Sequence, residues 1–263
     1  MKFWNKTLRS MDEYIPGEQP ANIEEYIKLN TNENPFPPSE KVLKTITEHV
    51  NANLRRYPDS KAKNVRNIFA EQNNLSTENI FVGNGSDEVF TLIFRGLIEK
   101  EGLAAFPYPS YSLYDTLAQG NGIKYEKIDL AEDLQIDMDR FLSPKYDMVI
   151  ISNPNNPTGT YVGPGKVKEF LKVYKGLLIM DEAYIDFYGG SAIGLINEFD
   201  NLIVTRSFSK SYSLAGLRVG LAIANPSIIE GLVKIKDSYN VDALALAGAE
   251  AALLDTRAFE YNL

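Results

Sequence analysis

A lysine flanked by hydroxyl and guanidinium groups is the most informative chemical feature of this sequence. Lys210 follows the apolar run Leu202–Thr205 and stands beside Ser207, Ser209 and, eight residues on, Arg218. A lone lysine is usually a solvated surface residue. Here the hydroxyls and the guanidinium favour a phosphate site, and the neighbouring primary amine can form a Schiff base with an aldehyde.

Asp181 adds a third chemical group to this pattern. It ends the apolar run Leu177–Met180, and a carboxylate at the inner end of a buried strand is costly unless it meets a cation or several donors. A metal ion, a protonated ring nitrogen or a simple capping role would each explain Asp181 alone. A phosphate, an aldehyde and an acid-paired ring nitrogen together predict pyridoxal 5′-phosphate as the cofactor.

The glycine-rich stretch Gly83–Glu88 follows an apolar run and precedes a helical pattern. Its backbone N–H groups are therefore expected to bind an anion at a helix N-terminus. A dinucleotide-binding fingerprint requires glycine where Glu88 stands, so that interpretation fails. The alternative is a tight turn in which Ser86 or Asp87 caps the helix. Neither a P-loop nor a G-x-S-x-G nucleophile elbow is present in the sequence.

The histidine and cysteine counts exclude several other chemistries. Cysteine is absent and His49 is the one histidine, so a thiol nucleophile, a disulfide framework and a zinc cluster are excluded, and no metal site is expected. A Ser-His-Asp hydrolase would have to use His49. That residue ends an expected helix, where a cation suits the helix dipole, so a structural role is expected.

The net charge and the hydropathy of the sequence indicate which partners to exclude and where in the cell the protein is expected. The net charge is −8 and no long basic run occurs, which argues against nucleic acid or an anionic membrane as a partner. The N-terminal residues lack the apolar core of a signal peptide, and no apolar run approaches the roughly 18 residues of a membrane span. A cytoplasmic location is expected.

Short apolar runs alternate with amphipathic helical patterns along the 263 residues. This alternation predicts an α/β fold with a mostly parallel sheet sandwiched by helices. A proline- and asparagine-rich segment before residue 39 is expected to be an irregular N-terminal arm. The expected strands are Ile80–Val82, Leu103–Phe106, Ile123–Ile128, Met148–Ser152, Leu177–Met180, Leu202–Thr205 and Val219–Ala224.

Polar or glycine-rich segments follow four of these strands. They are Gly83–Glu88, Asn153–Gly159, Asp181–Tyr184 and Ser207–Lys210. Ligands of open α/β sheets lie outside the carboxyl ends of the strands. The four segments therefore predict one composite site.

Together with Gly216–Gly220, the last three of these segments resemble the motifs of fold-type-I, class-II aminotransferases. Leu29–Pro35, Arg56–Asp59 and Pro109–Tyr111 resemble the histidinol-phosphate aminotransferase branch of that family. The resemblance runs from the arm to about Leu254. It implies the fold-type-I large domain, over residues 39–263, preceded by an arm over residues 1–38 that contributes to the substrate site and the dimer.

The resemblance also implies roles for individual residues. Lys210 would form the Schiff base, Asp181 would hold the protonated pyridine nitrogen, Asn156 and Tyr184 would bind the phenolic oxygen, and Tyr111 would stack on the ring. Lys210, Asp181 and Tyr184 would be the catalytic residues. The phosphate would be bound by Ser207, Ser209, Arg218 and the amides of Ser86 and Asp87.

A homodimer with shared sites is implied, because Tyr57 would reach the phosphate of the neighbouring subunit's cofactor. Tyr14 and Asn34 would lie near the substrate's own phosphate. The implied reaction exchanges an amino group between L-histidinol phosphate and 2-oxoglutarate in histidine biosynthesis, so glutamate is the amino form of the second substrate. A threonine-phosphate type decarboxylase and an aromatic aminotransferase share most of these motifs and stay open.

Family members continue beyond the matched region into a smaller C-terminal domain, which carries the arginine for the substrate's carboxylate or phosphate. The sequence ends at Leu263. A catalytically impaired fragment that binds pyridoxal phosphate is therefore a further expectation, with poor transamination by the chain as it stands.

Overall fold

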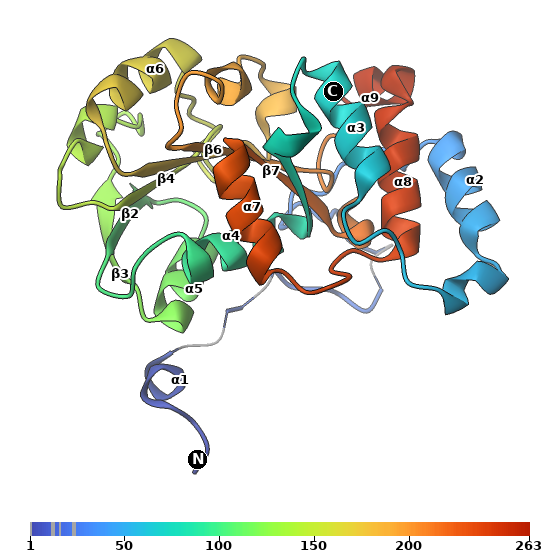
Figure 1. Ribbon diagram of the computed structural model, residues 1–263, viewed down its shortest axis with the longest axis horizontal. Coiled ribbons are helices and arrows are strands. Elements are labelled where there is room, and N and C mark those ends of the chain that lie inside the picture. Colours follow the sequence, from blue (N-terminus) through green and yellow to red (C-terminus); the bar gives the residue numbers. More distant parts are fainter. Residues whose placement is uncertain (1, 12–13, 16, 23–24) are drawn as a thin grey trace.

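The computed structural model describes residues 2–11, 14–15, 17–22 and 25–263 (Figure 1). Within these residues, seven strands form one sheet in the order β1-β7-β6-β5-β4-β2-β3. The strands are β1 (Ile80–Asn84), β2 (Leu103–Tyr108), β3 (Lys124–Asp129), β4 (Met148–Ser152), β5 (Leu177–Asp181), β6 (Leu202–Ser207) and β7 (Val219–Ala224).

Strand direction places the candidate site at one edge of the sheet. β3, β2, β4, β5 and β6 are mutually parallel. β7 runs antiparallel to both β6 and β1, so it alone opposes the others. Ser152 pairs with Asp181, and Asp181 pairs with Thr205, so the carboxyl ends of three central strands lie level with one another.

Helices cover both faces of the sheet, which explains why the strands are apolar on both faces. On one face, Met148 and Ile150 pack with α4, α5 and α7. On the other, Val149 and Ile151 pack with α2, α3, α6 and α8. The helices are α1 (Lys6–Ser10), α2 (Glu40–His49), α3 (Lys63–Gln72), α4 (Gly85–Gly96), α5 (Leu113–Asn121), α6 (Pro164–Val173), α7 (Pro226–Ile235), α8 (Ala243–Leu253) and α9 (Thr256–Tyr261).

The prediction of a mostly parallel sheet sandwiched by helices is confirmed. Each expected apolar run forms a strand, although β3 begins at Lys124 rather than Ile123. The interpretation of Ser86 or Asp87 as a helix cap is wrong. Helix α4 begins at Gly85, directly after β1, and both residues lie in its first turn.

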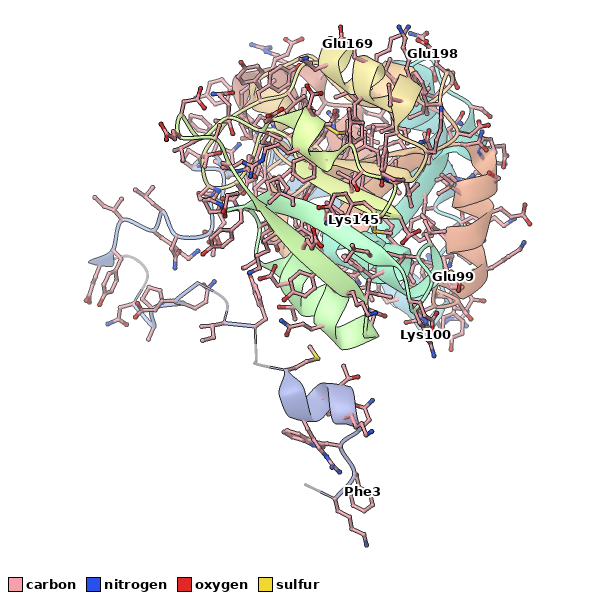
Figure 2. The ribbon with its side chains drawn as sticks, turned by 90° about the vertical axis from the view of Figure 1, so that its left-hand side faces the viewer. Phe3, Glu99, Lys100, Lys145, Glu169 and Glu198 are labelled. Atoms are coloured by element: carbon pink, nitrogen blue, oxygen red, sulfur yellow. The ribbon has the colours of Figure 1, made fainter. Side chains whose placement is uncertain are left out.

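Among its described residues, the N-terminal arm contains one α-helix, the five-residue α1. Figure 1 shows α1 below the rest of the chain, and Figure 2 shows Phe3 at the tip of the arm, away from the body. Farther along the arm, residues 30–33 return to the carboxyl edge of the sheet. None of the helices in the described ranges is long and apolar enough to cross a membrane.

Candidate active site

A cavity of about 480 Å³ opens at the carboxyl ends of β4, β5 and β6. Its wall also includes the first turn of α4, the segment after β2 (residues 110–112), arm residues 14, 17 and 30–33, and the loop between β6 and β7. This is where an α/β sheet presents its ligand-binding loops. The predicted site residues in this wall are Tyr14, Ser86, Asp87, Tyr111, Asn156, Asp181, Tyr184, Ser207, Ser209, Lys210 and Arg218.

Two predicted residues lie outside this wall. The Asn34 side-chain amide donates to the backbone carbonyl of Lys210 at 3.1 Å and to that of Asn262 at 3.3 Å, so it supports the lysine's loop. Tyr57 is 79% exposed and stacks on Tyr239, with ring centroids 4.3 Å apart. Its contribution to a neighbouring subunit stays a prediction.

Asp181 ends β5 and is buried beneath the cavity. The Tyr114 hydroxyl donates to its Oδ2 at 2.6 Å, and the Thr205 hydroxyl donates to its Oδ1 at 3.0 Å. The Ala183 amide adds a longer bond to Oδ1, at 3.3 Å. Burial raises the pKa of Asp181, while these three hydrogen bonds act in the opposite direction. A cation brought against Asp181 would therefore stabilise the ionised carboxylate that burial disfavours.

Lys210 lies in the loop after β6 and reaches across the cavity. Its Nζ donates to the Thr31 carbonyl at 2.6 Å and lies 5.5 Å from the centre of the Tyr184 ring. Burial lowers the pKa of Lys210, an effect that Glu33 opposes and Arg218 reinforces. A lowered pKa leaves more of the amine neutral, which is the nucleophilic form.

The groups predicted to bind phosphate meet at one end of the cavity. The Arg218 guanidinium donates to the Ser209 hydroxyl at 3.4 Å and to the Asp87 carboxylate at 2.9 Å. Gly85 and Gly220 permit this approach. A Cβ on Gly85 would lie 2.4 Å from Arg218 Nη2, and one on Gly220 would lie 2.3 Å from the Ser86 amide nitrogen. Hydroxyls, a helix N-terminus and a guanidinium together suit an anion.

Aromatic side chains flank the same space. Tyr111 packs edge-on against Tyr114, with centroids 5.6 Å apart, and its hydroxyl lies 3.5 Å from Oδ1 of Asp87, to which it donates a long hydrogen bond. Burial raises the pKa of Tyr111, so its phenol is neutral near neutral pH. The Tyr184 hydroxyl accepts a hydrogen bond from Asn32 at 3.1 Å. A flat ligand placed between Lys210 and Asp181 would thus meet neutral hydroxyl groups at its edges.

Sequence reasoning missed three groups that contact the predicted site residues. Tyr114 and Thr205 hold Asp181, and the Thr31 carbonyl holds Lys210. Tyr114 lies in the first turn of α5, three residues after Tyr111, which precedes the helix. Its closeness in the sequence to a predicted site residue was a usable signal. Thr205 lies in an apolar strand, so its sequence context did not suggest a role in the site. Thr31 acts through its backbone carbonyl, which every residue type has.

The fold and the site define a class of protein. Residues 24–262 match the model of the family described as aminotransferase class I and II, and the chain belongs to that family. Within the described residues, no group of three or more His, Cys, Asp or Glu side chains could hold a metal ion.

Within this family, the chain is similar to several histidinol-phosphate aminotransferases. The histidinol-phosphate aminotransferase of Clostridium beijerinckii is 43% identical over 98% of this chain and 73% of its own length. The crystal structure of a histidinol-phosphate aminotransferase from Clostridium acetobutylicum has a TM-score of 0.82 at 29% identity, over 89% of this chain and 71% of that one. The enzyme from Sinorhizobium meliloti, in complex with pyridoxal-5′-phosphate, has a TM-score of 0.89 at 24% identity, over 100% of this chain and 74% of that one.

The close approach at Gly220 leads to a first prediction. Gly220→Ala should weaken binding of pyridoxine 5′-phosphate, which carries a phosphate but no aldehyde, about tenfold or more, since forced overpacking costs roughly 1–3 kcal/mol. Titration calorimetry measures this change in Kd. Gly216→Ala is the matched control, because no atom lies within 4 Å of its added Cβ. Equal affinities for the two variants would contradict the prediction.

The buried hydrogen bond between Tyr114 and Asp181 leads to a second prediction. Tyr114→Phe should lower the free energy of unfolding of the cofactor-free protein by roughly 1.5–3 kcal/mol at pH 7, because the carboxylate loses a donor. Removing that donor raises the pKa of Asp181 further in the folded state, so the loss is present above that pKa and shrinks as the pH falls through it.

Urea unfolding at pH 7 and at pH 4, just above the ordinary carboxyl pKa of 3.8 from which that of Asp181 is raised, measures both quantities. Tyr125→Phe is the control, since the Tyr125 hydroxyl accepts from the neutral Gln119 amide at 2.8 Å and its loss carries no such pH dependence. The prediction is wrong if Tyr114→Phe costs the same at both pH values.

Proposed function

We propose that this aminotransferase uses pyridoxal 5′-phosphate to exchange an amino group between L-histidinol phosphate and 2-oxoglutarate in histidine biosynthesis. The relative from Clostridium beijerinckii, 43% identical over 98% of this chain, supports the substrate. The placement of Lys210, with its lowered pKa, in one cavity with Asp181 and Arg218 carries the proposal.

The chemistry of the cavity's side chains fits that cofactor. It offers an amine for an aldehyde, a buried carboxylate for a ring nitrogen, and a cluster of hydroxyl, amide and guanidinium donors for a phosphate. In this proposal Lys210 takes the aldehyde, Asp181 the pyridine nitrogen, Asn156 and Tyr184 the phenolic oxygen, and Tyr111 the ring face. Ser207, Ser209, Arg218 and the amides of Ser86 and Asp87 take the phosphate.

When bound, pyridoxal phosphate supplies an electron sink for the charge left on the substrate Cα after deprotonation. Asp181 keeps the proton on the ring nitrogen, because its carboxylate has no other cation within hydrogen-bonding distance among its described contacts. The Lys210 amine would hold the cofactor's aldehyde and, when free, would accept the substrate's Cα proton on Nζ and release it again. The lowered pKa of Lys210 leaves more of the amine unprotonated, and so able to accept a proton, at neutral pH.

The remaining assignments belong to the same proposal. Residues 1–38 form an arm that contributes to the substrate site and dimer, and residues 39–263 form the cofactor-binding domain. Two copies pair so that Tyr57, exposed here, reaches the neighbouring subunit's cofactor. Tyr14 and Asn34 lie near the phosphate of the substrate. The enzyme works in the cytoplasm on an amino compound and a keto acid, without nucleic acid or membrane.

Covalent capture at Lys210 tests the cofactor. The protein mixed with pyridoxal phosphate and reduced with borohydride should carry the cofactor's mass on the peptide that contains Lys210. Lys210→Arg should abolish this label, whereas Lys172→Arg, a change in the surface lysine of α6, should retain it. A label found on another lysine, or none in the unaltered protein, would overturn the cofactor assignment.

Relative rates of amino transfer test the substrate. In single-turnover experiments followed by absorbance, L-histidinol phosphate should react at least about a hundredfold faster than L-phenylalanine, because a site built for polar groups rejects a substrate that lacks them. L-Threonine O-3-phosphate should release no carbon dioxide. A faster reaction with phenylalanine would favour the aromatic aminotransferase, and release of carbon dioxide would favour the decarboxylase.

A further inference from the structure

A buried ionic network lies behind the candidate active site. Arg206, next to last in β6, is 15% exposed at its side chain. Its guanidinium lies 3.4 Å from a carboxylate oxygen of Glu182, whose side chain is fully buried, and forms an ion pair with Asp186. We call Arg206, Glu182, Asp186 and Ser211 the Arg206 network.

Both carboxylates are tied to further loops. Glu182 accepts hydrogen bonds from the Ser191 hydroxyl at 2.5 Å and the Ala192 amide at 2.7 Å. Asp186 accepts a bond from the Ser211 hydroxyl at 2.6 Å, and Ser211 is completely buried. The network thus joins the loop that follows β5 to the loop that follows β6.

Each member of the network adjoins a residue of the proposed site. Glu182 follows Asp181, Asp186 lies two residues after Tyr184, and Arg206 precedes Ser207. Ser211 follows Lys210 directly. In the described part of the chain, no side chain of the network lines the cavity. The network is joined to the site through the backbone of these neighbours.

Stability alone is a weak explanation for such a network. Taking charges out of water costs several kcal/mol per ion, and apolar side chains of similar volume in place of a buried ion pair are often neutral or stabilising. The fork of an arginine, however, contacts two carboxylates at once in a fixed geometry, which a lysine ammonium cannot do. The arrangement therefore suits a role in fixing positions.

We propose that Arg206 is a positioning residue. Through Glu182 and Asp186 it holds the Tyr184 loop, and through Asp186 and Ser211 it sets where the Lys210 amine stands. The proposal rests on the proposed function, because it concerns the capture of pyridoxal phosphate by Lys210. Removing a hydrogen bond or ion pair from the Arg206 network should weaken the capture of the aldehyde by Lys210 more than it weakens the non-covalent binding of the cofactor.

Two forms of the cofactor separate these effects. Pyridoxal phosphate has an aldehyde that Lys210 can capture, whereas pyridoxamine phosphate has an amine that it cannot. Titrating both into cofactor-free protein, with absorbance and fluorescence detection, gives the ratio of their dissociation constants. Ser211→Ala and Arg206→Lys should each weaken pyridoxal phosphate relative to pyridoxamine phosphate by about tenfold, the order expected for a lost hydrogen bond to a charged group.

Arg66→Lys is the matched control. The Arg66 side chain is 12% exposed and donates to the Thr77 carbonyl at 2.7 Å, on α3 and outside the cavity wall. This variant should lower the thermal midpoint without changing the ratio of dissociation constants. Ser211→Ala removes a single hydroxyl and carries the test if Arg206→Lys does not fold.

The outcomes distinguish this inference from the proposed function. If the variants lower only the thermal midpoint and keep the ratio of the unaltered protein, the network is merely structural and the inference is overturned. If the unaltered protein does not capture pyridoxal phosphate on Lys210, the proposed function fails and the inference falls with it. A third outcome is that the variants change the ratio of dissociation constants while the unaltered protein prefers an amino substrate other than L-histidinol phosphate. That result would support the inference and overturn only the choice of substrate.

Discussion

A carboxylate buried at the end of a central strand is the constraint on which the site depends. Asp181 is almost completely removed from water, and such a group is stable only where donors or a cation face it. Tyr114 from α5 and Thr205 from β6 supply hydroxyl donors. Hydrogen bonds to Asp181, in addition to apolar packing, therefore fix the positions of α5 and β6 relative to β5.

The same constraint organises the ends of the neighbouring strands. Ser152, Asp181 and Thr205 lie level across β4, β5 and β6, so the loops that follow them open into one space. Glu182, one residue beyond Asp181, turns away from the cavity toward Arg206. Two adjacent acidic residues thus face different environments, Asp181 toward the cavity and Glu182 toward the partly buried Arg206.

Much of this architecture follows from local sequence patterns. Strands buried on both faces are continuous apolar runs, as Met148–Ser152 is, and these stand out against polar helices and loops. The positions of Lys210 and Asp181 follow from the rule that ligands lie beyond the carboxyl ends of such strands, whereas Arg218 directly precedes β7. Their presence in one cavity is what the four polar strand ends predicted.

The partners of these residues were harder to predict, for physical reasons. Thr205 has ordinary strand propensity, and only its pairing with Asp181 gives its hydroxyl a role. Thr31 acts through a backbone carbonyl, which every residue has. Helix α1 is five residues long, too short for a periodic pattern to stand out.

The antiparallel direction of β7 relative to β6 places Lys210 and Arg218 close together along the chain. Because β7 starts at the edge where β6 ends, the chain does not have to cross the sheet between Ser207 and Arg218. A parallel β7 of six residues would place Arg218 roughly 20 Å away, at the far edge. The Lys210 amine and the Arg218 guanidinium therefore belong to one continuous hairpin connection, residues 208–218. Insertions outside this connection leave their separation along the chain unchanged.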